Sequence, residues 1–522
     1  MTGIGNVLVP VPVILPLLAA GIKFLIGAHQ RRLREAISVT VLVTIAVVAG
    51  VLLYQADRYG PQVAQAGGWP APVGISLVAD RFAALVLLVS ALVTLFVLIY
   101  ALGQGLADED DTAPLAIFHP SYLVLMAGVA CAFLAGDLFN LFVGFEILLT
   151  ASYVLITLGG TAARIRAGTT YVIINLFSSL VFLVAIAFVY AATGTINLAQ
   201  LSHRLAELDP GVAQVLQLML LLGFAIKAAV FPLSAWLPDS YPTASAPVTA
   251  VFAGLLTKVG VYTMIRTQTL LFPDNPLTVI LAVAAILTMV VGILGALAQD
   301  DIKRLLSFTL VSHVGFMVFG IALATQAAIA GAVFYIVHHI TVQTALFLTV
   351  GLIERRTGTT SKERLGGLIR VSPLLGVLFF VPAMSLGGIP PFSGFMAKLG
   401  LLQAGIGVGG PTAWALVIAS LATSLLTLYA VCLVWNRSFW GERGQVARDG
   451  QVDAVGLSGK DIVVTKSLPR TMVWPTGVLI AVMVGYTVVA GPLADLADRT
   501  AEELLDPESN YIQSVPFHEE AK

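Results

Sequence analysis

The sequence predicts an all-α polytopic membrane protein that crosses the bilayer about fourteen times. Of its 522 residues, 58% are hydrophobic and only 11% are charged, against about 25% charged in ordinary soluble domains. The mean hydropathy is +0.93, and apolar runs long enough to span a bilayer recur along the whole chain. So few charges cannot cover a water-soluble surface, so we expect one helical bundle in lipid.

Fourteen apolar stretches account for the predicted helices. They cover residues 7–28, 35–54, 75–103, 115–135, 138–158, 168–192, 212–231, 246–270, 277–298, 303–324, 328–353, 373–406, 411–436 and 472–491. The first stretch lacks the preceding basic segment of a signal peptide, so we expect it to be retained as a helix. Segment 195–208 has apolar residues at helical spacing opposite a polar face, which predicts a short helix lying at the external membrane surface.

Prolines interrupt the chain at two of these helices. The sequence FPLSAWLPDSYPTASAP follows helix seven, and LGGIPPFSG divides helix twelve. Proline removes a backbone donor, so such a break survives inside a membrane only where protein covers it or where it lines a wet cavity. Broken helices at corresponding places in two halves of a chain indicate a transport site.

The distribution of basic residues predicts the orientation, because loops rich in Lys and Arg stay in the cytoplasm. With both termini outside, most of the 28 basic residues fall in predicted cytoplasmic loops. We therefore expect a multi-pass protein of the cell inner membrane. The acidic loop GQGLADEDDTAP also falls on the cytoplasmic side, and acidic residues count little in this rule. The hydrophilic segment 441–470 is expected to be a cytoplasmic loop or a lateral extension.

Three lysines lie deep in the apolar stretches: Lys227, Lys258 and Lys398. A mid-helix lysine costs about 2.5–3.5 kcal/mol on insertion scales. Each could merely join neighbouring helices through a buried hydrogen bond, but three such residues favour a function. Lys23 lies within a turn of the end of helix one, where we expect its side chain to reach the membrane surface.

An acidic residue in helix five complements these lysines. Glu146 would stabilise the ammonium form of Lys227 or Lys258 if it lay within a few ångströms, whereas burial would favour the neutral amine. Opposed effects of this kind suit a lysine that gains and loses protons. Asp137, nine residues earlier in the sequence, is interpreted as a hydrated helix cap more readily than as a member of a relay.

Helix eleven carries the adjacent residues His338 and His339, with Gln343 one turn beyond His339. Histidine titrates near neutrality and suits a water-linked proton wire, so this pair is a candidate for one. His313 in helix ten could equally be a member of the wire or a core residue.

Several classes of function lack their sequence signatures. The chain has no Walker loop, no strand-anchored GxGxxG, no nucleophile elbow and no Cys or His cluster at zinc or iron–sulfur spacing. Cys131 and Cys432 both lie in apolar runs and are interpreted as core residues. A net charge of −1 provides no basic surface for nucleic acid. We expect no cofactor and no metal, and an ion gradient or partner subunits as the driving force.

The stretches that carry these residues resemble a known membrane module. DLFNLFVGFEILLTASYVLI, GFAIKAAVFPLSAWLPDSYPTASAPVTAVFAGLLTKVGVY, QDDIKRLLSFTLVSHVGFM, HHITVQTALFLTVG and GGIPPFSGFMAKLGLLQA are similar to the proton-translocating module shared by complex I antiporter-like subunits and multisubunit Mrp cation/proton antiporters. The resemblance covers predicted helices four to twelve. It implies a proton relay across the membrane mid-plane at Glu146, Lys227, Lys258 and Lys398.

The resemblance also implies two inverted five-helix repeats. The expected division is an N-terminal group of three helices (1–114), a first repeat of helices four to eight (115–270), a second repeat of helices nine to thirteen (271–440), and a final part with a cytoplasmic loop, helix fourteen and an acidic tail (441–522). Many relatives have lysine at the position of Gln343, so His338 and His339 would need water to bridge the gap here.

Within the family, LPDSYPTASAPVTAVFAGLLTKVGVY is most similar to the D-type subunit of Mrp antiporters. The resemblance implies a secondary transporter subunit, not an enzyme, that moves protons in a monovalent cation (Na⁺)/proton antiporter together with other antiporter subunits; Li⁺ or K⁺ could replace Na⁺. One alternative is an antiporter-like proton-pumping subunit of a respiratory NADH dehydrogenase or membrane-bound hydrogenase complex. Another is a membrane scaffold that transports nothing.

Overall fold

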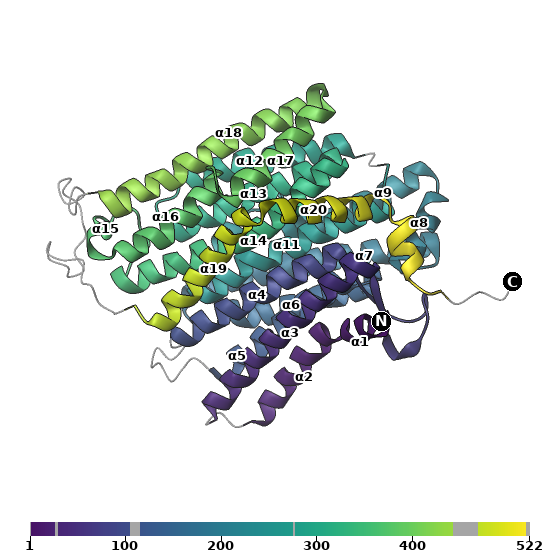
Figure 1. The fold of residues 1–522 in the computed structure, drawn as a ribbon, viewed down its shortest axis with the longest axis horizontal. Coiled ribbons are helices and arrows are strands. Elements are labelled where there is room, and N and C mark those ends of the chain that lie inside the picture. Colours follow the sequence, from purple (N-terminus) through teal and green to yellow (C-terminus); the bar gives the residue numbers. More distant parts are fainter. Residues whose placement is uncertain (1, 27–29, 105–114, 275–276, 442–467, 518–522) are drawn as a thin grey trace.

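The computed structural model describes residues 2–26, 30–104, 115–274, 277–441 and 468–517. These residues form a bundle of helices that run roughly side by side along its long axis (Figure 1). The described residues begin and end at the same end of the bundle (Figure 1), which we call the terminal end. The acidic loop and most of segment 441–470 lie outside the described residues.

Within the part of the chain that the structure describes, thirteen helical segments are long and apolar enough to cross a bilayer. They are Gly5–Lys23, which takes in parts of α1 (Thr2–Leu8) and α2 (Val11–Leu25), α3 (Arg31–Tyr59), α4 (Arg81–Gly103), Ile117–Leu134 of α5 (Leu115–Leu134), α6 (Leu138–Thr157), α7 (Ala162–Thr193), α9 (Pro210–Ala228), α11 (Ala246–Leu271), α12 (Thr278–Leu297), α13 (Ile302–Leu323), α14 (Gln326–Thr357), α18 (Gly410–Val434) with its extension to Trp440, and α19 (Arg470–Val488). The interrupted pair α16 (Pro373–Gly387) and α17 (Ser393–Val408), of 15 and 16 residues, is together long enough for a fourteenth crossing. The predicted all-α fold with about fourteen crossings is confirmed.

Shorter elements connect these helices. They are α8 (Leu198–Ala206), α10 (Trp236–Ser240), α15 (Leu368–Val371), α20 (Ala490–Leu505), the antiparallel strands β1 (Gln62–Gln65) and β2 (Ser76–Ala79), the 3₁₀ turns at Ala66–Gly68 and Tyr241–Thr243, and the π turns at Trp435–Trp440 and Glu508–Ile512. The short helix predicted within 195–208 is present as α8, at the terminal end (Figure 1).

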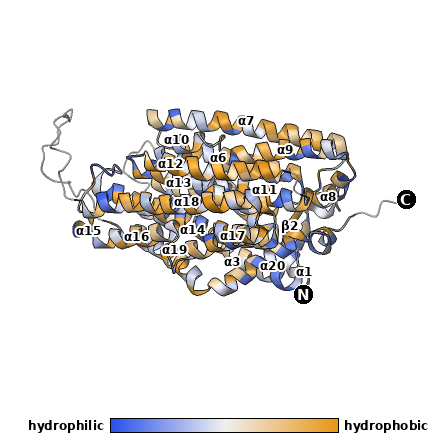
Figure 2. Cartoon of the chain, turned by 90° about the horizontal axis from the view of Figure 1, so that it is seen from above, coloured by the Kyte–Doolittle hydropathy of each residue, from blue (hydrophilic) through white to orange (hydrophobic). Residues whose placement is uncertain are grey.

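The helices differ in how much lipid they can meet. Every residue of α11 is buried, and so is the most apolar window of α14. On α7, by contrast, large apolar side chains such as Ile173, Phe177 and Leu180 are exposed, and hydrophobic residues predominate along the helix (Figure 2). Polar residues on α11 and α14 therefore face other protein groups, not lipid.

Both predicted helix breaks are present, and the two begin with the same turn. Ala229 and Gly388 have positive φ angles of 59° and 83° directly after α9 and α16. In each turn a backbone N–H reaches the carbonyl five residues back, from Val230 to Ala225 at 2.9 Å and from Ile389 to Met384 at 3.1 Å, as in a Schellman motif. Such a turn ends a helix while still satisfying some of its last carbonyls.

A second pair of matching turns follows α7 and α14. Each helix ends in Thr-Gly-Thr, with φ of 73° at Gly194 and 75° at Gly358. After the first turn, the carbonyl of Ile196 accepts a hydrogen bond of 2.9 Å from the backbone N–H of Leu138, the first residue of α6. After the second turn, the carbonyl of Thr360 accepts one of the same length from Ile302, the first residue of α13. The first turn leads into α8 and the second towards α15, at opposite ends of the bundle (Figure 1). Inverted repeats produce matched contacts of this kind.

Lys23 departs from its predicted position. Its side chain is fully buried and donates a hydrogen bond to the hydroxyl of Ser38 on α3. That hydroxyl lies 3.1 Å from Nδ1 of His119 on α5. The expectation that Lys23 reaches the membrane surface is therefore wrong, because α3 and α5 offer the ammonium a polar partner inside the bundle.

The positions of the exposed residues Arg204, on α8, and Glu363, beyond α14, predict labelling from opposite sides of the membrane. In a Cys432→Ser background, where Cys131 stays buried, Glu363→Cys should react with an impermeant maleimide only from one side and Arg204→Cys only from the other. The measurement is labelling of intact and permeabilised cells. Labelling of both positions from the same side would contradict the fold.

Candidate functional site

Glu146 and Lys227 meet through a serine. Ser179 on α7 donates a hydrogen bond to Oε1 of Glu146 on α6. Nζ of Lys227, in the last turn of α9, donates to the Ser179 oxygen at 3.1 Å, and it lies 4.9 Å from the centre of the Phe145 ring. The structure thus brings the predicted carboxylate and lysine together, with one hydroxyl between them.

Lys258 occupies the fully buried helix α11 and is itself 1% exposed. Its ammonium donates to the carbonyl of Ala253 in the same helix at 2.6 Å. No carboxylate in the described ranges forms an ion pair with it. The sequence left open whether Glu146 would stabilise Lys227 or Lys258, and the structure places it beside Lys227.

The two adjacent histidines of α14 have different surroundings. Nδ1 of His338 lies 3.0 Å from the hydroxyl of Ser393, the first residue of α17. The His339 ring lies 5.2 Å from the ring of His313 on α13, and neither of its buried nitrogens hydrogen-bonds to a described protein group. His338 thus belongs to the break in helix twelve, whereas His339 is not committed to a protein partner.

His313 is held by two hydroxyl groups. The Tyr335 hydroxyl lies 2.8 Å from Nδ1 of His313, and Oγ1 of Thr427 lies 3.3 Å from its Nε2. Both ring nitrogens are therefore paired, and the ring position is fixed between α14 and α18.

Lys398 lies at the break between α16 and α17, as the sequence predicts. Its ammonium donates to the carbonyls of Leu386 at 3.0 Å and Gly387 at 3.4 Å, at the end of α16. It also lies 5.0 Å from the centre of the Phe316 ring. The last carbonyls of a helix carry partial negative charge, so the break itself stabilises the ammonium form.

Asp137 and Gln343 each form a hydrogen bond with the protein backbone. Asp137 caps α6 by accepting from the backbone N–H of Asn140 at 2.6 Å, and burial raises the pKa of its carboxyl to about 6. The cap interpretation is correct, but the expected hydration is not, because the residue is only 6% exposed. Gln343 donates to the carbonyl of Leu306 at 2.7 Å and so ties α14 to α13.

Sequence reasoning missed the hydroxyl groups of the site, Ser179, Tyr335 and Ser393. Each is a neutral residue in an apolar helix, and neither charge nor spacing distinguishes it from the other hydroxyl residues of the chain. Only the geometry shows that Ser179 connects two charged groups.

Comparisons with known proteins agree along the chain. Residues 135–427 match the family described as NADH:quinone oxidoreductase/Mrp antiporter, TM. The chain is 40% identical to the D-type Na(+)/H(+) antiporter subunit of Alkalihalophilus pseudofirmus over 514 residues, covering 98% of this chain and 99% of that protein. It is 36% identical to the corresponding Bacillus subtilis protein, covering 98% and 99%.

Two solved structures have the same fold. A chain of the Mrp complex from Dietzia sp. DQ12-45-1b superposes with a TM-score of 0.86 at 32% identity, covering 98% of this chain and 99% of that one. A chain of the membrane-bound sulfane sulfur reductase, an archaeal respiratory membrane complex, gives 0.83 at 26% identity, covering 98% and 100%.

The fold and the site together define a multi-pass membrane protein whose central helices hold buried ionisable groups beside interrupted helices. The family match spans more than half of this chain, and the relatives from Alkalihalophilus and Bacillus match almost all of it. The chain belongs to the NADH:quinone oxidoreductase/Mrp antiporter family.

The serine bridge predicts an unequal effect of two neighbouring substitutions. Ser179→Ala leaves Glu146 and Lys227 without their shared partner and should lower the unfolding free energy by about 1–3 kcal/mol. Ser178→Ala removes only a bond to the carbonyl of Gly223 and should cost less. Thermal unfolding of the two purified variants in detergent compares them, and equal midpoints would show that the bridge contributes little.

Proposed function

We propose that the chain is the proton-conducting subunit of a multisubunit monovalent cation/proton antiporter that exchanges Na⁺. The observation that carries the proposal is the hydrogen-bonded series from Lys227 through Ser179 to Glu146 inside membrane-spanning helices. Groups of this kind are costly in lipid, and their default interpretation is an ion or proton pathway. Full-length similarity to D-type subunits of Na(+)/H(+) antiporters supports the choice of ion and the presence of partner subunits.

The serine gives the first part of the pathway a mechanism. A hydroxyl donates one hydrogen bond while it accepts another. When Lys227 passes a proton to the Ser179 oxygen, Ser179 can pass its own proton to Glu146, so an ammonium and a carboxylate become an amine and a carboxylic acid. Return of the proton along the same bonds restores the charged pair.

The second part of the pathway lies at the other break. Lys398 rests on the carbonyls that end α16, and His338 reaches the same break through Ser393. Helix α11, which carries Lys258, packs against both α9 and α14. We propose that protons move between Lys227 and Lys398 by way of Lys258, His339 and His338, with His313 as a support.

The same proposal divides the chain at the limits expected from sequence. Helices one to three (1–114) and the final part (441–522) flank two inverted repeats, 115–270 and 271–440. The matched turns after α7 and α14, and after α9 and α16, support this division. Each repeat then contributes one interrupted helix and one lysine beside it.

The orientation follows from charge. Basic residues gather in the last turn of α14 and in the chain that follows it, at the end of the bundle opposite the terminal end; they are Arg355, Arg356, Lys362, Arg364 and Arg370. Loops rich in Lys and Arg remain cytoplasmic. We propose that this end faces the cytoplasm of a cell whose inner membrane holds the protein, with both termini outside.

The chief alternative is an antiporter-like proton-pumping subunit of a respiratory complex. The match to a chain of an archaeal respiratory membrane complex favours it. The relay would be the same, but the energy would come from oxidoreductase subunits. Antiport by the purified complex without any redox substrate would separate the two functions.

A double-mutant cycle tests the relay. Glu146→Gln and Lys227→Ala should each lower proton-coupled Na⁺ antiport in inverted vesicles by about a hundredfold or more. Since each group acts through the other, the double variant should lose little beyond either single variant. Pull-down of the partner subunits checks assembly.

Matched controls lie outside the centre of the bundle. Glu363→Gln and Lys303→Ala change the same residue types at the bundle end, where Lys303 pairs with Glu354 at 2.6 Å, and both should retain antiport. Near-normal activity of assembled Glu146→Gln would refute the relay. Losses that multiply in the double variant would place the two residues at separate points.

A further inference from the structure

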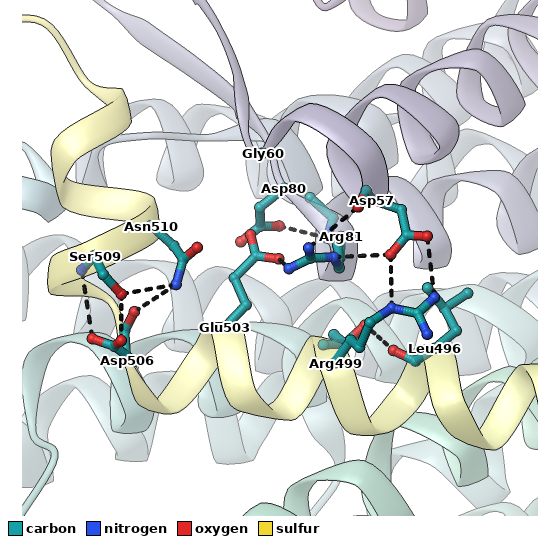
Figure 3. A network of polar contacts seen from close by, with 12 residues as sticks. Asp57, Gly60, Asp80, Arg81, Leu496, Arg499, Glu503, Asp506, Ser509 and Asn510 are labelled. Carbon is teal, nitrogen blue, oxygen red and sulfur yellow. Dashed lines mark hydrogen bonds and ion pairs between the residues drawn. The ribbon is translucent and has the colours of Figure 1, made fainter.

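A second group of charged residues joins α3, α4 and α20 at the terminal end of the bundle, and Figure 3 shows its contacts. Arg81 at the start of α4 donates to Oδ1 of Asp57 on α3 at 3.0 Å and to Oε2 of Glu503 on α20 at 2.6 Å. Arg499 on α20 also donates to Asp57, at 3.0 and 3.1 Å. Together with Asp80 and Arg266, these residues form what we call the terminal ion cluster.

Glu503 differs from Asp57 within this cluster. Its side chain is 2% exposed, against 23% for Asp57. Asp57 accepts from two arginines, whereas Glu503 accepts from Arg81 alone, and its buried Oε1 has no hydrogen-bond partner among the described residues. A structural clamp would need only a fully paired carboxylate such as Asp57. The unpaired oxygen of Glu503 makes this residue a candidate for a group that changes its protonation.

The charges around Glu503 have opposite effects on the pKa of its carboxyl. Asp80 and Arg81 at the start of α4 and Arg266 on α11 act on Glu503. Asp57 on α3 and Arg499 on α20 pair with each other beyond Arg81, and the Tyr511 ring centre lies 5.0 Å from the guanidinium carbon of Arg266. Burial and the neighbouring Asp80 raise the pKa of the Glu503 carboxyl to about 7, against the opposing effect of Arg81 and Arg266. The carboxyl therefore gains its proton as the pH falls through neutrality.

Helix α11 connects this cluster with the centre of the bundle. Lys258, Tyr262 and Arg266 follow one another at four-residue steps and so share one face of the helix. Eight residues span about 12 Å. Arg266 pairs with Asp80 at 2.5 Å and donates to the Tyr262 hydroxyl at 3.3 Å. Polar contacts thus reach from the terminal ion cluster to Tyr262, which lies one turn from Lys258 on the same face of a wholly buried helix.

We propose that Glu503 is the group through which the proton pathway exchanges protons with the external solution. The inference rests on the proposed function and adds an external end to its relay. The carboxylate takes one proton from external water and gives one proton inward towards Lys258, so that it returns to its charged form. Arg81 and Arg266 act through their positive charge.

Four variants of the complex separate proton exchange from a clamp that merely fastens α20. Glu503→Gln keeps an acceptor for Arg81 but cannot titrate, whereas Glu503→Asp keeps the carboxyl. Arg499→Gln breaks the contact of α20 with Asp57 and leaves Glu503 intact. Glu502→Gln removes a charge from the exposed neighbouring position. The measurement is Na⁺-driven proton antiport in inverted vesicles as a function of pH, with assembly checked by pull-down.

Glu503→Gln should assemble, lose antiport by about tenfold or more, and lose the inflection of the pH profile near neutrality. Glu503→Asp should restore activity, and the other two variants should behave as wild type. A wild-type rate and pH profile in Glu503→Gln would overturn the proposal. Equal losses in Arg499→Gln and Glu503→Gln would overturn it as well, because they would identify a clamp.

A measurement that does not depend on antiport distinguishes a failure of the Glu503 proposal from a failure of the proposed function. Infrared difference spectra of the purified complex should show a protonated carboxyl band that titrates near neutral pH in wild type and is absent from Glu503→Gln. If wild-type vesicles show no antiport, the proposed function fails, and this band still decides whether Glu503 exchanges protons. Identical spectra of wild type and Glu503→Gln would refute the assignment whatever the transport result.

Discussion

Lipid offers no hydrogen bonds, so every charge and every open backbone group inside the bundle must find a partner within the protein. At the break in helix twelve, the end of α16 and the buried lysine Lys398 stabilise each other. The break after α16 leaves carbonyls without helical donors, and the ammonium of Lys398 binds them. At the other break, the indole of Trp236 donates to the carbonyl of Ile226 at 3.1 Å. Neither break would be stable at that depth without such partners, and at Lys398 the break and the charge occur together because each supplies the partner of the other.

The same constraint determines where the polar residues lie. Helices α11 and α14 have their long apolar segments wholly inside the bundle, and they carry Lys258, His338 and His339. The lipid-facing helix α7 contributes Ser179 from its inward side. The result is a series of polar groups surrounded by apolar helices, in which a hydroxyl or an imidazole can exchange hydrogen bonds without exposing a charge to lipid.

Much of this arrangement could be predicted from the sequence. Hydropathy predicted the crossings, proline predicted both breaks, and charge in apolar surroundings predicted Lys227, Lys258 and Lys398. The bridging role of Ser179 could not be predicted, because a neutral hydroxyl is ordinary in any helix and its two partners come from other helices. The burial of Lys23 depended in the same way on Ser38, a residue of the next helix.

The terminal ion cluster could not be predicted from the sequence either, since Asp57 and Arg499 are 442 positions apart in the chain. The segment that holds Glu503 becomes a packed element because α20 lies against α4, α11 and α14, and no local pattern predicts contacts with three separate helices.

The proposed single pathway depends on Lys258, because α11 packs against α9, which carries Lys227, and against α14, which carries His338 and His339. The Lys258 ammonium hydrogen-bonds to a carbonyl of its own helix, so Lys258→Ala should leave the packing of α11 intact. The direct test is proton flux through the reconstituted complex with this variant, with Lys303→Ala as the matched lysine control. We expect normal assembly and a flux lower by about a hundredfold or more, whereas wild-type flux in an assembled Lys258→Ala complex would show that the two parts do not form one pathway.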